Sequence, residues 1–349
     1  MAFPEPRPTK PELPRKSVRS LPCRQGAVRA VRFNVDGRYC LTCGSDKSLS
    51  LWSPLRGTLL RTYSGHGAEV LDAAGSFDNS RLCSGGSDRA VLFWDVASGQ
   101  ILRKFRGHAG KVNCVQFNEE ATVIVSGSID SSVRCWDCRS RRPDPVQILD
   151  EAKDGISSIK LSDHEILAGS VDGRSRRYDL RMGELAADYV GSEYGHKGLG
   201  RAQLRTLMLE PTPLQVPSLV CALAKMASAH SSPALTPPFD SWIKTQGSCL
   251  ERASLMFPHP RYMGHKNREY KLDCCLSERD THVVSASEDG SVYFWDLVEG
   301  TLALTLPVGR GVVQSLAFHP TEPCLLTASE GTVQCWREES FVAEDDLPA

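Results

Sequence analysis

Cysteine, histidine, serine and aspartate occur in this sequence at spacings that could support chemistry. Cys40 and Cys43 stand three residues apart, as do Cys135 and Cys138, and this spacing can bind zinc or form a redox pair. Histidines that follow a glycine recur ahead of a serine and an aspartate, the combination used in nucleophilic catalysis. Whether either chemistry is available depends on the elements that position these side chains.

Both cysteine pairs fall in short apolar runs that we predict to be strands. Side chains three apart on a strand face opposite sides of the sheet, so neither pair can converge on a metal ion without a bulge. The sequence contains no glycine-rich phosphate loop, nucleophile elbow or zinc-peptidase motif. We therefore expect no metal, no cofactor and no enzymatic activity.

The bulky aromatic residues are periodic. Five tryptophans and one tyrosine recur at intervals of 41 or 42 residues, interrupted once, at Trp52, Trp94, Trp136, Tyr178, Trp295 and Trp336. An aspartate stands six residues before each of the first five, at Asp46, Asp88, Asp130, Asp172 and Asp289. Glu330 occupies that position before Trp336. Such self-similarity indicates a fold built of repeated units.

Each unit contains short alternating or apolar runs separated by turn residues, as in KVNCVQF, TVIVSGS and VRCWD, and several units add a fourth run such as GQILRKF. Four strands in about 42 residues make one blade of a β-propeller. In these repeated runs and in the Gly-His pairs, residues 23–190 and 264–336 resemble the WD40-repeat family. We expect an all-β propeller, nominally seven-bladed, with six recognisable blades.

The repeated polar residues fit a structural role. An aspartate in the turn between the second and third strands can accept hydrogen bonds from backbone N–H groups and from a histidine. That histidine can bond a serine or threonine hydroxyl, and the hydroxyl can accept the indole N–H of the tryptophan. Members of the family use this network structurally, so the resemblance implies the same role here. The complete sets are His66, Ser84, Asp88 and Trp94; His108, Ser126, Asp130 and Trp136; and His265, Ser285, Asp289 and Trp295. The partial sets are Thr42, Asp46 and Trp52; Asp172 and Tyr178, with Ala168 in place of the hydroxyl; and Trp336.

The last repeat supplies only three strands, and the segment Ser17 to Cys23 has no blade of its own. Because an open ring would expose sheet edges, we expect this segment to be the outer strand of the last blade. The predicted organisation is a flexible tail over 1–14, the closing strand and four blades over 15–192, two blades over 264–337, and an acidic tail over 338–349.

The remaining segment, 193–263, is rich in proline and lacks the repeat pattern. We expect it to be disordered, as a replacement for a lost fifth blade. Such a replacement could come from alternative splicing or a faulty gene model. A functional insertion is the other interpretation, and the sequence leaves both open.

The charge balance bears on partners and location. The chain has 41 Lys and Arg against 42 Asp and Glu, so bulk electrostatic binding to nucleic acid or a membrane is not expected. No apolar stretch predicts a membrane span or a signal peptide, and the 13 cysteines fit reduced, buried thiols. We expect a soluble protein of cytoplasm and nucleus, monomeric within larger complexes.

Two groups of residues are candidate partner contacts. The first lies near the start of the predicted first strands and contains Arg29, Asn113, Ser157 and Gln314. The second is basic and contains Arg139, Arg141, Arg142, Arg174, Arg176 and Arg177. The basic group predicts one patch for phosphorylated or acidic partners or an RNA backbone, unless these are solvated strand and loop arginines.

A ring of small sheets without a catalytic constellation favours a protein-interaction scaffold. Within the WD40 family, runs such as AVRAVRFNVDGRYC and KFRGHAGKVN are similar to those of a member that organises a kinase cascade. That resemblance implies partners among the extracellular-signal-regulated (MAP) kinase cascade and the spliceosome. The alternative is a generic adaptor or ribonucleoprotein component without a kinase role.

Overall fold

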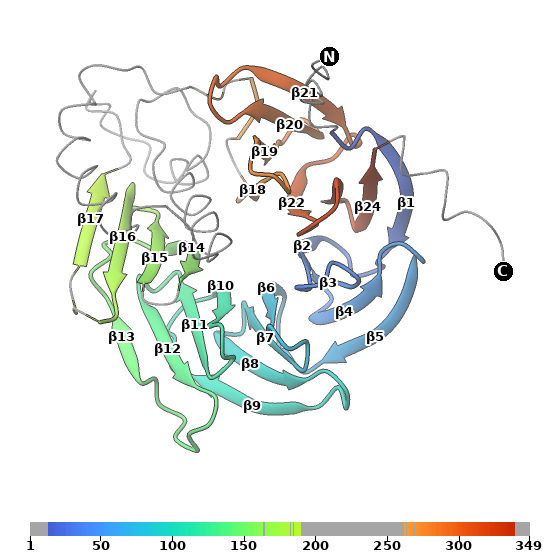
Figure 1. Cartoon of the computed structure of the whole chain (residues 1–349). Helices are drawn as coiled ribbons and strands as arrows, with labels where there is room; N and C mark the ends of the chain where they lie inside the picture. Colours follow the sequence, from blue (N-terminus) through green and yellow to red (C-terminus); the bar gives the residue numbers. More distant parts are fainter. Residues whose placement is uncertain are drawn as a thin grey trace, which may run out of the picture.

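The computed structural model describes residues 13–162, 165–181, 183, 185–189, 262, 264–267 and 270–338. Regular structure within these residues consists of β-strands, arranged in six four-stranded antiparallel sheets. The sheets stand around a common axis as the blades of a propeller (Figure 1). This confirms the predicted all-β propeller with six blades. No helix in this part of the chain has the length and apolar character to cross a membrane.

In five of the six sheets the strands follow one another in sequence from the axis outward. The first sheet contains β2 (Val28–Phe33), β3 (Cys40–Gly44), β4 (Ser48–Ser53) and β5 (Thr58–Ser64). The second contains β6 (Val70–Gly75), β7 (Arg81–Gly86), β8 (Ala90–Asp95) and β9 (Ile101–Arg106). The third contains β10 (Val112–Phe117), β11 (Val123–Ser128), β12 (Val133–Asp137) and β13 (Gln147–Leu149).

The fourth sheet contains β14 (Ile156–Leu161), β15 (Glu165–Ser170), β16 (Arg174–Asp179) and β17 (Leu185–Tyr189). The fifth contains β18 (Cys274–Leu276), β19 (His282–Ala286), β20 (Ser291–Asp296) and β21 (Leu302–Pro307). The sixth contains β22 (Val313–Phe318), β23 (Cys324–Ser329), β24 (Thr332–Arg337) and, as its outer strand, β1 (Lys16–Pro22).

The inner strands of neighbouring sheets pack side by side around the axis. β22 lies against β2, β2 against β6, β6 against β10, and β10 against β14, and β18 lies against β22. Within the described residues, β14 and β18 are not packed in this way. The fourth and fifth sheets therefore stand on either side of the interruption in the repeat, which lies outside the described residues.

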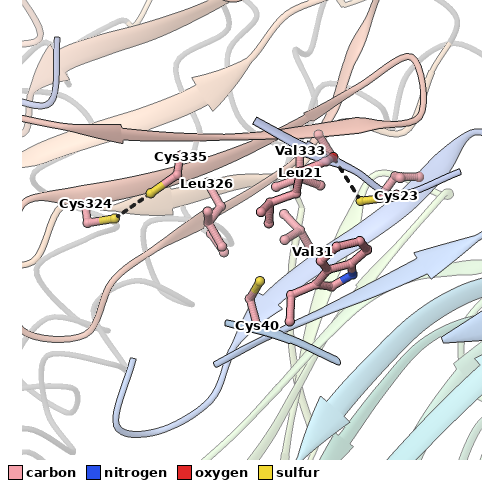
Figure 2. Packing of buried hydrophobic residues seen from close by; sticks show 12 residues of the cluster. Leu21, Cys23, Val31, Cys40, Cys324, Leu326, Val333 and Cys335 are labelled. Carbon is pink, nitrogen blue, oxygen red and sulfur yellow. Dashed lines mark hydrogen bonds between the residues drawn. The ribbon is translucent and has the colours of Figure 1, made fainter. Parts of the chain in front are cut away.

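The sixth sheet is joined to the first by a strand from the N-terminal part of the chain. β1 pairs with β24 in antiparallel register, Lys16 opposite Arg337 and Pro22 opposite Thr332, with one irregularity between Ser17 and Arg19. Leu21 of β1 is fully buried, and its cluster joins the sixth sheet to the first (Figure 2). The predicted closing strand is thereby confirmed.

Four thiols belong to this closing cluster. Cys23 lies in the segment before the first sheet, and Cys40 lies in that sheet. Cys324 and Cys335 belong to the sixth sheet, and the Sγ atoms of these two residues are 3.5 Å apart (Figure 2). Burial raises the pKa of Cys23 to about 11. Cys43 packs in a different cluster, between the first and second sheets, so Cys40 and Cys43 face opposite sides of their strand.

Several predicted segments fall largely outside the described residues. These are residues 1–12 of the N-terminal tail, 339–349 of the acidic tail, and nearly all of 193–263. Tyr262 is described and corrects one boundary. Its ring packs beside Trp295 at 5.9 Å and its hydroxyl donates to the Leu297 carbonyl at 2.8 Å, so it belongs to the fifth sheet's core.

Removing residues 15–23 is expected to lower the melting temperature sharply, because it exposes the edge of β24 and opens the closing cluster. Leu21→Ala tests the same contact more gently and is expected to lower the free energy of unfolding by about 2–5 kcal/mol. Ser20→Ala, at an exposed position of the same strand, is the control and should change the free energy of unfolding by less than about 0.5 kcal/mol. Urea and thermal denaturation measure all three, and an unchanged melting curve for the deletion contradicts closure by β1.

Candidate functional site

The ring presents two faces of loops. The upper face carries the turns between second and third strands and the connections from one sheet to the next. The lower face carries the turns between first and second strands and those between third and fourth strands. Corresponding strands point the same way in every sheet, because each sheet repeats the same antiparallel order around the axis. The position of a residue along its strand therefore determines whether it lies near the upper or the lower face.

An aspartate holds the turn between the second and third strands in five sheets. In each case its carboxylate accepts the backbone N–H two residues on, at 2.9 to 3.3 Å. The intervening residue has positive φ, and in three sheets it is not glycine: Lys47, Arg89 and Ser131. The carboxylate thus stabilises a backbone conformation that L-residues rarely adopt.

The full four-residue network forms in the second and third sheets. In the second, the Trp94 indole donates to Ser84 Oγ at 2.8 Å, Ser84 Oγ meets His66 Nε2 at 2.8 Å, and His66 Nδ1 meets Asp88 at 3.0 Å. The third sheet repeats this with Trp136, Ser126, His108 and Asp130 at 2.8, 2.8 and 2.9 Å. Ser84 and Ser126 are fully buried, so these sets fix the structure and do not face a substrate.

The electrostatics of these two sheets follow from burial and hydrogen bonding. Burial by itself would raise the pKa of Asp88, but bonds from His66 and the Gly67 N–H outweigh it and lower the pKa to about 2. The pKa of Asp130 is likewise lowered to about 2, where bonds from Ser132 and His108 oppose burial. Both carboxylates are therefore ionised at neutral pH.

The first and sixth sheets build shorter versions. The Trp52 indole donates to Thr42 Oγ1 at 3.0 Å, and Thr42 donates to Gln25 Oε1 at 2.6 Å. Gln25 therefore takes the place of the missing histidine, which sequence reasoning did not identify. In the sixth sheet the Trp336 indole donates to Thr327 Oγ1 at 2.9 Å.

The fourth sheet corrects the prediction for Arg176. This arginine is almost fully buried, and its guanidinium bonds the Asp172 carboxylate at 2.6 Å. With Ala168 in the hydroxyl position and no histidine, the buried aspartate needs another donor, and Arg176 supplies it. Arg176 is therefore a structural residue and not an exposed partner contact.

The fifth sheet contains the four expected residues but does not join them as predicted. His265 Nδ1 is buried without a hydrogen-bond partner in the described part of the chain. Tyr293 donates its hydroxyl to Asp289 at 2.7 Å instead, and Ser285 Oγ donates to the Ala286 carbonyl at 3.0 Å. Burial lowers the pKa of His265 to about 4, so the ring is neutral at pH 7 and contacts the Trp295 ring edge-on.

The candidate contacts on the inner strands are bulge residues. A register shift falls at the second residue of the first strand in five sheets, which places Arg29, Asn113, Ser157 and Gln314 in the bulges. All four are half-buried and bonded within the ring. Arg29 pairs with Glu69 at 3.2 Å and meets Gln314 at 3.4 Å, so the ring brings these two candidates together.

The other two candidates bond elsewhere. Asn113 Nδ2 donates to the Ile156 carbonyl of the neighbouring sheet at 2.8 Å, and Ser157 Oγ donates to the Gly169 carbonyl at 3.1 Å. These contacts hold the inner strands in place. They leave the four residues less available to a partner than the sequence alone suggests.

The predicted basic patch divides between the two faces. The lower face carries Arg139, Arg141 and Arg142, which follow the end of β12. The upper face carries Arg174, which begins β16. Arg177 is engaged with Glu165 at 3.6 Å, and Arg139 with Asp137 at 3.5 Å. The prediction of a single basic patch is therefore wrong, because the third strand of every sheet starts on the upper face and ends on the lower face.

A charged cluster on the axis was not predicted. Arg32 of β2 pairs with Asp72 of β6 at 3.0 Å and with Asp273, just before β18, at 2.8 Å. Asp273 accepts the Ser315 hydroxyl, and Asp72 accepts the Val115 N–H at 3.3 Å. Five of the six sheets meet in this cluster. Burial alone would raise the pKa of Asp273, but the Arg32 charge outweighs it and lowers the pKa.

Comparison with known proteins is consistent with this geometry. The family model described as WD domain, G-beta repeat, matches residues 15–53, 57–95, 99–137, 258–296 and 300–337. The chain is 68% identical over 344 residues to WD repeat domain-containing protein 83 of Rattus norvegicus, with 99% of each chain covered. It is 68% identical over 345 residues to the protein of that name in Homo sapiens, again with 99% of each covered. An uncharacterized WD repeat-containing protein of Schizosaccharomyces pombe is 44% identical over 295 residues, 84% of this chain and 88% of that protein.

Ser84→Ala is expected to lower the free energy of unfolding by about 1–3 kcal/mol, because it leaves the Trp94 indole and His66 Nε2 buried without their shared partner. Ser64→Ala, at the exposed end of β5, is the matched control and should change it by less than about 0.5 kcal/mol. Urea denaturation measures both. Equal effects of the two substitutions would contradict a structural role for the network.

Asp88→Asn is expected to destabilise the protein most at neutral pH. The folded pKa of about 2 lies below the unfolded value, so ionised Asp88 adds stability above about pH 4 that is lost as the pH falls to about 2. The difference in free energy of unfolding between native protein and variant should narrow over that range. The exposed Asp144→Asn variant is the control, and a difference that does not depend on pH would contradict the assignment.

Proposed function

The chain belongs to the WD40-repeat family, and from this premise we propose that it is a non-enzymatic scaffold on which several proteins bind together. The observation that carries the proposal is the joined ring of six sheets. It presents ordered loops on two faces, and side chains from five sheets are fixed through one axial cluster. Rigid loops on a rigid frame lower the entropy cost of binding, which suits a protein that holds partners in place.

The buried networks support a role without catalysis. A nucleophilic serine must be reached by substrate and activated by a free histidine. Ser84 is fully buried and shared between the Trp94 indole and His66, and His66 is held at its other nitrogen by Asp88. Neither requirement is met at these Ser-His-Asp sets.

The partners that we propose come from resemblance. The runs that carry the family likeness also resemble mitogen-activated protein kinase organiser 1, a WD-repeat protein. On that basis we propose that the chain organises components of the extracellular-signal-regulated kinase cascade and associates with the spliceosome during pre-mRNA splicing, in cytoplasm and nucleus. A generic adaptor or ribonucleoprotein component without a kinase role is the second candidate.

Tandem affinity purification of the full chain from separated cytosolic and nuclear fractions tests the proposal. The expected result is recovery of kinase-cascade proteins from cytosol and of spliceosomal proteins from nuclei. The chain without residues 15–23 is the control for dependence on a closed ring. Nuclear particles alone, retained through salt washing, would favour the second candidate, and recovery of no protein from either fraction would contradict a scaffold.

A further inference from the structure

Exposed apolar side chains gather on the lower face. Phe77, in the turn between β6 and β7, is 69% exposed, and Val35 and Tyr39, in the turn between β2 and β3, are 40% and 41% exposed. The first and second sheets are adjacent in the ring (Figure 1). On the upper face, by contrast, the exposed large apolar residues of the described chain are Ile129 and Tyr270, which lie in separate sheets.

The two turns are fixed to each other. Asn34 Nδ2 donates to Asn79 Oδ1 at 3.0 Å, and Asn79 Nδ2 donates to Asp36 Oδ2 at 2.9 Å. The first turn is also held from its other side, where Gly37, at φ +72°, lies so close to the His319 ring of the sixth sheet that a Cβ atom would overlap it. Val35, Tyr39 and Phe77 therefore stand on a preformed platform, which reduces the ordering cost of binding.

The charge beside the platform is negative. Asp36 directly follows Val35 and Asp78 directly follows Phe77, and neither carboxylate has an ion pair in the described structure. Hydrogen bonds from the Ser76 and Ser80 hydroxyls lower the pKa of Asp78 to about 2, so it is charged at neutral pH. Arg38 is the single basic residue of the two turns. Farther round the face, the neighbouring turn of the third sheet adds Glu119 and Glu120.

Large exposed apolar groups beside an excess of charge of one sign are typical of a binding surface for a partner of the opposite sign. We propose that Val35, Tyr39 and Phe77, with Asp36 and Asp78, form a docking surface for a protein segment that carries an apolar side chain next to lysine or arginine. The inference rests on the proposed scaffold function and specifies one of its contact surfaces. The apolar side chain packs against Phe77, and the basic residues lie beside the two carboxylates.

An array of short peptides tests this surface. Each peptide carries a central Phe, Leu or Ile flanked by Lys or Arg, and a matched set carries Asp or Glu flanks. The full-length protein is expected to bind the basic set selectively, and the affinity of the best peptides, measured by fluorescence anisotropy, should fall as NaCl is raised. Phe77→Ser should weaken binding about tenfold or more. Asp36→Asn with Asp78→Asn should weaken the basic set and reduce its advantage over the acidic one.

Ile129→Ser, at an exposed apolar site of the upper face, is the matched control and should bind as the native protein does. Thermal melting checks that every variant is folded. Binding of neither set, equal binding of both sets, or binding that Phe77→Ser leaves unchanged would overturn the proposal. So would self-association in sedimentation that Phe77→Ser abolishes, because the occupant would then be a second copy.

Affinity purification with the same variants separates this proposal from the scaffold function. Loss of a subset of partners with Phe77→Ser, but not with Ile129→Ser, supports the surface. If the native chain recovers partners and Phe77→Ser recovers the same ones, the surface is wrong and the scaffold function stands. If the native chain recovers none, the scaffold function itself fails, and peptide binding then decides the surface on its own.

Discussion

A ring of sheets is stable only when its last edge is covered, and here one pair of strands covers it. β1 and β24 lie far apart in the sequence, and their ladder joins the sixth sheet to the first. The matched family repeats show why this works. Four of the five begin with the outer strand of one sheet and end with the third strand of the next, so the first repeat supplies a strand that only the last sheet can use. Leu21 and the thiols around it then fill the joint.

Inside the ring, the buried polar groups of the sheets find their hydrogen-bond partners in different residue types. A buried indole needs an acceptor and a buried carboxylate needs donors, because unpaired polar groups are costly away from water. The second and third sheets use serine and histidine together. Elsewhere Gln25 completes the bonds of Thr42, Arg176 neutralises Asp172, and Tyr293 satisfies Asp289. Related hydrogen bonds recur from sheet to sheet while the residues that supply them vary, and His265 Nδ1 of the fifth sheet has no such partner in the described structure.

Periodic features were predictable from the sequence, and isolated ones were not. The spacing of tryptophan and aspartate predicted the six sheets, and the three-strand last repeat predicted closure by the N-terminal segment. Spacing could not show that Arg176 is buried, because its neighbours on β16 are also arginines and the absent histidine left no trace in the pattern. Nor could it pair Arg32 with Asp273, because no repeat relates residues so far apart in sequence. The bulges that hold Arg29 and Gln314 have no sequence signal either.

The joint between β1 and β24 also imposes an order of events on synthesis. β1 leaves the ribosome long before β24, its partner in the ladder, and at roughly 5–20 residues per second it remains unpaired for tens of seconds. Throughout that time the backbone groups of β1 lack their ladder with β24, and Leu21 lacks its neighbours from the sixth sheet, although later blades can already assemble. Contacts this distant along the chain slow folding and leave an open edge to other nascent chains. A newly made copy is therefore most vulnerable to aggregation immediately before its two ends meet.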